Sequence, residues 1–135
     1  GRKADWRVAV SYNGGTERMA DVSGAPRAVW MGAALFTQRH VASPWSVAVR
    51  PEFYWDPQGR MTEHDQLLWA KSSTIEFKKH VGQQLVIVRL EHRYDRSTGS
   101  EGGFFRDGFS SPGVQRLTAD QHLAILGLIL AFDSA

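Results

Sequence analysis

The sequence predicts an all-β fold, an antiparallel up-and-down meander of about six strands. First, six runs of residues alternate between apolar and polar side chains, with the period of two of a strand. Second, the connectors between these runs alternate strictly between short and long. Third, no run approaches the roughly 20 consecutive apolar residues of a transmembrane helix. Short turns at one end and long loops at the other are typical of outer-membrane barrels. We therefore interpret the meander as part of a transmembrane β-barrel wall.

The six predicted strands cover about Asp5–Asn13, Val29–Ala42, Trp45–Asp56, Leu67–Val81, Gln84–Arg96 and Gln121–Phe132. The connectors after the second and fourth strands are the dipeptides Ser43-Pro44 and Gly82-Gln83. The other three connectors are long, polar and rich in glycine, and they cover about Gly14–Ala28, Pro57–Gln66 and Ser97–Asp120.

Composition fits one modest domain. With 42% hydrophobic and 22% charged residues the chain is ordinary for a folded protein. The mean hydropathy of -0.33 does not argue against a membrane barrel, because lipid-facing residues alternate with polar ones along its strands. There is no cysteine, which excludes disulfides and thiolate metal sites. The net charge of +2 is small and scattered, so the sequence indicates no nucleic-acid partner.

The third predicted strand has the clearest alternation. One face carries only apolar residues, and the other carries charged and small residues together with Tyr54. The apolar face begins at Trp45 and ends at Trp55, ten residues later. At about 3.3 Å per residue and a tilt near 45°, that separation projects to roughly 23 Å along the membrane normal. This nearly matches the apolar band of a barrel, which is about 25 Å tall and has aromatic girdles at both rims.

The same alternation assigns the faces of the other strands. We expect aromatic residues of the outward face to lie at the membrane interfaces. These are Trp30, Trp45, Trp55, Trp69, Tyr94 and Phe132. Lys71 and Lys79 then also point outward, near the rims, and both faces of the last strand are apolar. Pro51 cannot donate a hydrogen bond within a ladder, so we expect a bulge or local break there.

Charged residues gather on the inward face of the third, fourth and fifth predicted strands. Because these strands are consecutive, their side chains can form a cross-strand ladder of opposite charges. In a barrel this ladder would line a water-filled lumen and influence which solutes pass. Its members are Arg50, Glu52, Glu76, Lys78, Arg89, Glu91, Arg93 and Asp95.

The end of the chain gives the meander a direction. An apolar strand that closes with Phe132 resembles the last strand of bacterial outer-membrane proteins, whose terminal aromatic is read by the insertion machinery. If this strand ends at the periplasm, both short turns are periplasmic and all three long loops are extracellular. That is the arrangement of outer-membrane barrels.

Several motifs resemble the OmpL-like family of outer-membrane β-barrel porins. They are the segment 50–54 leading into Asp56-Pro57-Gln58-Gly59, the segment 89–97, Phe104-Phe105, and a last strand that opens with Gln121. The resemblance extends from about Trp30 to the end of the chain. It implies a bacterial outer-membrane location and the C-terminal portion of a larger barrel. We accordingly expect residues 1–135 to be one barrel segment that lacks its N-terminal strands and signal peptide, since six strands are fewer than the eight of the smallest bacterial barrels.

The function that follows is a porin, not an enzyme, through which small hydrophilic solutes diffuse passively without a cofactor. The expected partners are the lipid bilayer with its lipopolysaccharide, small polar solutes, the insertion machinery, and a second copy of the chain in a homo-oligomer. One alternative is a membrane-anchored barrel that binds or adheres through its extracellular loops. Another is a soluble lipocalin-like barrel whose charged face is solvated.

Enzymatic and metal-binding functions find little support. A serine and a histidine such as Ser73 and His92 could be imagined together on the wall, but nothing specifies a base, an orienting group and an oxyanion hole. The histidines have no zinc-binding spacing, and only His64 has a carboxylate on each side. We therefore expect neither catalytic residues nor a metal site.

Overall fold

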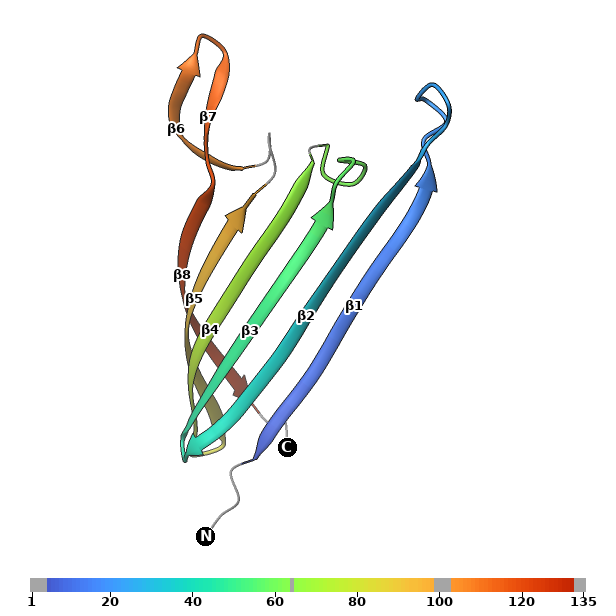
Figure 1. Ribbon diagram of the computed structural model, residues 1–135. Helices are drawn as coiled ribbons and strands as arrows, with labels where there is room; N and C mark the ends of the chain where they lie inside the picture. Colours follow the sequence, from blue (N-terminus) through green and yellow to red (C-terminus); the bar gives the residue numbers. More distant parts are fainter. Residues whose placement is uncertain (1–4, 64, 99–102, 133–135) are drawn as a thin grey trace.

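A curved antiparallel sheet makes up most of the molecule (Figure 1). The computed structural model describes residues 5–63, 65–98 and 103–132, and His64 therefore lies outside the described residues. The strands are β1 (Trp6–Arg18), β2 (Arg27–Ala42), β3 (Trp45–Asp56), β4 (Gln66–Val81), β5 (Gln84–Ser97), β6 (Phe104–Ser111), β7 (Val114–Thr118) and β8 (Asp120–Phe132).

Strands that follow each other in the sequence pair throughout the large sheet, except that β5 pairs with β8. Its order is β1-β2-β3-β4-β5-β8, and every pairing is antiparallel. The short strands β6 and β7 pair with each other as a separate hairpin. Within the described residues the large sheet is open, because β1 and β8 each pair with one neighbour only. The fold is thus the predicted up-and-down meander, with a hairpin inserted between its last two strands.

All six predicted strands are present, and the connectors follow the predicted rhythm. The turns at Ser43-Pro44 and Gly82-Gln83 lie at one end of the sheet, and the three long connections lie at the other (Figure 1). Two details differ from the prediction. β1 continues to Arg18, which shortens the first long loop, and the third long connection contains β6 and β7. Glycine-rich sequence hid the end of β1, since Gly14 and Gly15 are strand residues here.

Pro51 produces the predicted local break, but no bulge. β3 runs through it, and the pairing of β3 with β4 is continuous from Trp45 to Asp56. The ladder to β2 is interrupted opposite Pro51, but the register is the same on both sides of the gap. The interruption is local because proline lacks only its own N–H. The irregularity of this ladder is instead at His40 and Ala42, beside the short turn.

Helices play no part in how the described residues are organised. None of the described residues forms a helix with the length and apolar character that crossing a membrane would require.

Candidate functional site: the charged concave wall

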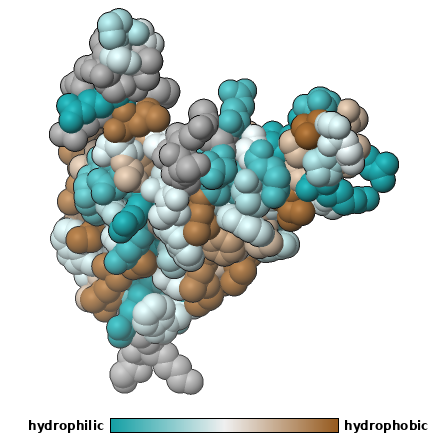
Figure 2. Space-filling view, turned by 45° about the horizontal axis from the view of Figure 1, so that its top comes forward, coloured by the Kyte–Doolittle hydropathy of each residue, from teal (hydrophilic) through white to brown (hydrophobic). Residues whose placement is uncertain are grey.

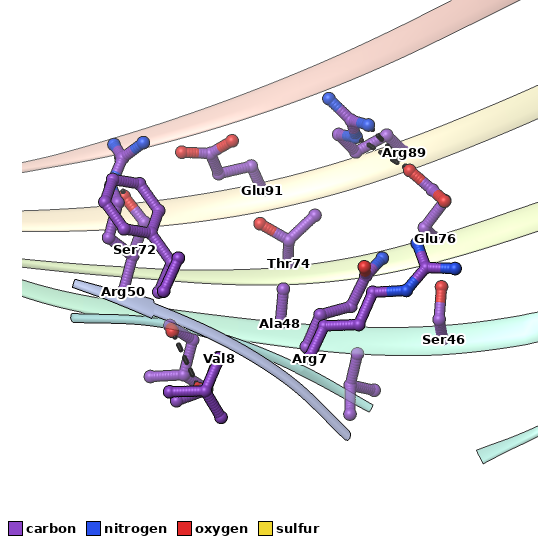
Figure 3. A pocket seen from close by; sticks show the side chains of 16 residues that line it. Arg7, Val8, Ser46, Ala48, Arg50, Ser72, Thr74, Glu76, Arg89 and Glu91 are labelled. Atoms are coloured by element: carbon purple, nitrogen blue, oxygen red, sulfur yellow. Dashed lines mark hydrogen bonds and ion pairs between the residues drawn. The ribbon is translucent and has the colours of Figure 1, made fainter. Parts of the chain in front are cut away.

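The sheet has a concave face that several strands line together. One groove, with a cavity volume of about 350 Å³, is bordered by residues of β1, β2, β3, β4 and β5. Figure 3 shows side chains such as Arg50, Thr74 and Glu91 rising from successive strands into this groove. Residues that are direct cross-strand partners share a face, so the register extends the assignment to the whole sheet. We call this the concave wall and the opposite side the convex face.

Polar residues are buried on the concave wall. Ser72 is 4% exposed and Asp95 is 7% exposed, and Asp56 is completely buried. On the convex face, by contrast, Trp69 and Leu90 are each 52% exposed and Leu126 is 76% exposed. Figure 2 shows apolar patches on the visible surface below the more hydrophilic loops. This is the reverse of a water-soluble protein, in which apolar side chains fill the interior.

An ion pair between two strands that are not neighbours organises the middle of the concave wall. The guanidinium Nη2 of Arg93 on β5 lies 2.6 Å from Oε1 of Glu52 on β3. The pair passes over β4, where the intervening positions are the small residues Ser72 and Ala70. Small side chains on β4 therefore leave the space through which the two longer side chains meet.

The same network extends along the wall in both directions. Arg93 Nε donates to Oδ1 of Asp95 at 2.7 Å, and Gln121 Nε2 on β8 donates to Oδ2 of Asp95 at 3.0 Å. On β3, Arg50 Nε lies 3.3 Å from Oε2 of Glu52, and Arg50 Nη2 donates to Ser72 Oγ at 3.3 Å. The network thus connects β3 and β5 through paired charges, and β4 and β8 through hydrogen bonds of Ser72 and Gln121.

A second ion pair lies nearer the short turns. Arg89 and Glu76 are direct cross-strand partners, and Nη2 of Arg89 lies 2.6 Å from Oε2 of Glu76 (Figure 3). Three charged groups of the wall form no ion pair with any residue that the structure describes: Arg7, Lys78 and Glu91. Arg7 and Glu91 both border the groove, from β1 and from β5.

The structure places all eight residues of the predicted charged ladder on one face. Glu76 and Arg89 are cross-strand partners, so the charged positions of β4 and β5 lie on the same face. The pairing of Arg50 with Ser72 shows the same for β3 and β4. Six of the eight form ion pairs. Lys78 and Glu91 form no ion pair with any described residue. Sequence reasoning missed Arg7, Ser72 and Gln121 as contributors to this wall, although all three obey the alternation of their strands.

Aromatic residues form staggered rows on the convex face. Trp55 pairs with Leu67, two residues before Trp69, and Trp69 pairs with Arg96, two residues after Tyr94. Such a constant stagger from strand to strand is what tilted strands produce at one level of a barrel. The three aromatics thus lie on one line across β3, β4 and β5. Near the short turns, the ring centroids of Trp45 and Phe77 lie 5.1 Å apart.

Trp30 is a correction to the predicted set of interface aromatics. The register places it opposite Gly15, on the face of Gly32 and Tyr54, which is the concave wall. A Cβ atom on Gly15 would lie 2.3 Å from the Trp30 ring, so the ring covers the surface that the glycine leaves open. Both faces of β2 are apolar around this position, and the sequence therefore could not assign its direction. The other five predicted aromatics lie on the convex face.

Sequence reasoning missed an aromatic on β1. Trp6 is 60% exposed on the convex face, near the end of the sheet that holds the short turns. Its cross-strand partner is Arg39, whose guanidinium carbon lies 5.2 Å from the ring centroid. Trp6, Val8, Val10 and Tyr12 alternate with small or polar residues, and this alternation is the signal that could have identified the face.

The loop after β3 is fixed to the top of the wall. Asp56 accepts hydrogen bonds from the backbone N–H groups of Arg60, Met61 and Thr62, and from the Thr62 hydroxyl. Burial alone would raise the pKa of Asp56, but these hydrogen bonds outweigh burial and lower it. Arg60 also binds both carboxylate oxygens of Glu17, at 3.1 and 3.0 Å, and thereby lowers the pKa of Glu17.

The meander, the exposed apolar face and the charged concave wall together define a protein of the transmembrane β-barrel class. A family model described as "Putative beta-barrel porin-2, OmpL-like" matches residues 3–132. The chain therefore belongs to this porin family, and the match covers nearly the whole chain, including the N-terminal strand that the sequence motifs did not reach. No curated protein and no solved structure matches it.

Proposed function

We propose that this chain forms part of the wall of an outer-membrane porin through which small hydrophilic solutes diffuse passively. The convex face contacts the lipid, and the concave wall borders a water-filled lumen. One observation carries this proposal: charged groups cluster on the concave wall while large apolar side chains are exposed on the convex face. In a barrel, strands alternate between lipid-facing and lumen-facing residues in this way.

The polarity of the wall also argues against the soluble alternative. A lipocalin-like barrel would place apolar side chains inside and polar ones toward water. Here Glu52, Arg93 and Asp95 lie inside and Leu126 and Leu128 lie outside. Exposed apolar area of this extent on a soluble monomer would favour association with another apolar surface. A lipid bilayer supplies that surface to every strand at once.

The direction of the wall in the membrane follows from the connectors. We place the long loops outside and the short turns in the periplasm, as in bacterial outer-membrane barrels. Phe132, 67% exposed on the convex face, then lies at the periplasmic rim, where the insertion machinery would contact the last strand. Because β1 and β8 have free edges within the described residues, further strands must close the lumen. These come from the rest of a longer barrel or from a second copy.

Neighbouring residues of β4 offer a direct test. The chain contains no cysteine, so single cysteines can be introduced without background labelling. Thr74 borders the groove on the concave wall, and Ile75, the next residue, is 50% exposed on the convex face. Full-length protein carrying Thr74→Cys or Ile75→Cys would be reconstituted in planar bilayers and treated with a charged, water-soluble thiol reagent.

The expected result is that the reagent changes the conductance of the Thr74→Cys channel and leaves that of Ile75→Cys unchanged. If the unmodified protein forms no channel in any preparation, the porin proposal is wrong. If both cysteines react equally with the charged reagent, the assignment of the two faces is wrong.

A second function is favoured by how the extracellular end is built. The loop after β3 is held by the buried Asp56 and by the ion pair of Arg60 with Glu17, and the β6–β7 hairpin projects beyond the sheet (Figure 1). Ordered loops on a rigid scaffold are suited to binding. A barrel that binds a ligand through these loops but conducts nothing would support this anchor function over the channel.

A further inference from the structure

Polar and charged side chains gather at one place on the convex face, at the end of the sheet near the long loops. Lys71 on β4 and His122 on β8 are the cross-strand partners of Tyr94 on β5, so the three side chains form one row. On β5, His92 and Arg96 occupy the convex positions on either side of Tyr94. The lysine, the arginine and the two histidines of this group are exposed, and Tyr94 is partly exposed. We call the five residues the rim cluster.

The two histidines of the rim cluster contact each other directly. Nε2 of His92 lies 3.1 Å from Nδ1 of His122, and the rings stack with their centroids 5.3 Å apart. The ring of Tyr94 packs against His122 at 4.8 Å. A neutral imidazole carries one N–H. Whichever ring donates to the other, the pair therefore still presents one free N–H donor to its surroundings.

The side chains of the two cations of the rim cluster have no partner among the residues that the structure describes. Neither Lys71 nor Arg96 forms a hydrogen bond or ion pair with a residue that the structure describes. Asp120, the acidic residue nearest to them on this face, is the cross-strand partner of Arg96 but forms no ion pair with it in the described structure. At the opposite rim, Arg39 instead lies over the ring of Trp6. The cations of the rim cluster thus require a partner from the medium.

We propose that the rim cluster binds the phosphate of a lipopolysaccharide molecule in the outer leaflet. This inference rests on the proposed function, which places the convex face in the outer membrane with the long loops outside. Charge-assisted hydrogen bonds from lysine and arginine suit a phosphate, and the histidine pair and the Tyr94 hydroxyl add neutral donors. Lys71 and His122 lie two strand spacings apart, about 10 Å, so their side chains can reach one phosphate from opposite sides.

The apolar part of the same face fits the rest of such a lipid. Below the rim cluster, Leu90 on β5 and Leu126 on β8 are cross-strand partners, and both are exposed. Leu128 continues this surface toward the short turns and is 66% exposed. This arrangement, with a polar cluster above an apolar surface, matches a lipid whose phosphorylated headgroup lies above its acyl chains.

The test compares lysines at the two ends of strand β4. Lys79 lies on the same face of β4 as Lys71 but near the short turns, where the proposal expects no lipopolysaccharide. The full-length barrel, the variant Lys71→Ala/Arg96→Ala and the control Lys79→Ala would be placed in nanodiscs. The probe is the diphosphorylated lipid anchor of lipopolysaccharide, with its enzymatically dephosphorylated form as the matched lipid. Bound lipid is counted by native mass spectrometry.

We expect each removed cation of the rim cluster to weaken binding of the phosphorylated probe roughly fivefold, with Lys79→Ala unchanged. His122→Phe should keep the ring packing and lose a smaller part of the affinity. Equal loss in Lys79→Ala, or equal binding of the dephosphorylated probe, would overturn the proposal. Conductance separates this outcome from the porin function, because the rim variants should conduct like the unmodified protein even if lipid binding is absent.

Discussion

The concave and convex faces of β3, β4 and β5 are made from alternate residues of the same segments, yet they are stabilised differently. On the concave wall, charged side chains find partners within the chain, as Glu52 does with Arg93 and Glu76 with Arg89. On the convex face, Trp69 and Leu90 are half exposed, and aromatic contacts such as that of Phe53 with Trp69 cover only part of them.

This difference shows which face depends on the surroundings. The ion pairs of the concave wall form within the chain and need no outside partner, whereas a wide apolar surface is stable only in contact with another apolar phase. Substitutions should therefore have unequal effects on the two faces, even at adjacent positions. The predictions below test this inequality, beginning with the largest expected effect.

The first prediction introduces a charge on each face of β4. Ile75→Arg places a guanidinium on the convex face, where an arginine near the bilayer midplane costs about 2–4 kcal/mol. Thr74→Arg places the same group one residue away, beside the unpaired Glu91 that is its cross-strand partner on β5. We expect a large loss of folding free energy in lipid vesicles for Ile75→Arg and almost none for Thr74→Arg, measured by urea titration. Equal losses would refute the assignment of the faces.

The second prediction concerns Asp56, at the upper end of the concave wall. Asp56→Asn removes the negative charge that accepts four hydrogen bonds from the loop. Hydrogen bonds to charged groups contribute about 1.5–3 kcal/mol each, so opening of this loop should become at least tenfold more frequent. Hydrogen exchange at the Met61 and Thr62 amides measures the change. Asp21→Asn is the control, because Asp21 contacts Arg60 only at 3.8 Å and should leave both amides protected.

The same carboxylate gives the loop a pH dependence. The pKa of Asp56 is lowered in the folded chain from its ordinary value of 3.8. The stabilisation is therefore fully present above that ordinary value and is lost as the pH falls through the lower, folded pKa. Lower protection factors of the Met61 and Thr62 amides in strong acid, and unchanged protection factors between pH 5 and 8, are the expected result. Loss of protection already at pH 5 would contradict this reading.

Much of this fold could be predicted because alternation with a period of two is a strong signal where one face is apolar and the other charged. β3 and β5 satisfy that condition, and their faces and ion-pairing residues followed from the sequence. The alternation of short and long connectors also fixed the end of the sheet at which each loop lies. Nothing beyond the order of residues was needed for these features.

The failures of prediction have physical reasons. Trp30 lies between apolar neighbours on β2, so the register with Gly15, a long-range property, decides its direction. The ion pair of Glu52 with Arg93 spans two strand spacings and depends on small residues between them on β4. The β6–β7 hairpin lies in a glycine-rich segment that is typical of a loop. Each of these features depends on which residues become neighbours in space.

The third prediction removes one partner of the central network. Glu52→Gln leaves Arg50 and Arg93 on the wall without their shared carboxylate. Because these groups are partly exposed to water, we expect a loss of about 1 kcal/mol rather than the larger cost of breaking a buried pair. Urea titration of Glu52→Gln, Arg93→Gln and the double variant gives their coupling energy. If the losses of folding free energy in the two single variants add up to the loss in the double variant, the pair contributes nothing.

The last and smallest effect should come from the unpaired charges of the groove. Arg7, Gln38, Ala48, Thr74 and Glu91 are successive cross-strand partners, so Arg7 and Glu91 lie at the two ends of one row. Neither charge is neutralised by an ion pair in the described structure, and each would therefore act on an ion in the proposed lumen. At about 8 Å in water and physiological salt, one charge changes the energy of an ion by only about 0.2 kcal/mol.

We therefore expect Glu91→Gln to shift the permeability ratio toward anions and Arg7→Gln to shift it toward cations, each by about twofold, because the lost charge acts with opposite sign on the cation and on the anion. Reversal potentials in a salt gradient measure both shifts. Folding free energy should not change in either variant, in contrast to Glu52→Gln, since no ion pair is lost. Shifts of the same sign would show that one of the two side chains does not reach the lumen. A large loss of stability in Glu91→Gln would instead reveal a partner for this carboxylate in the complete barrel.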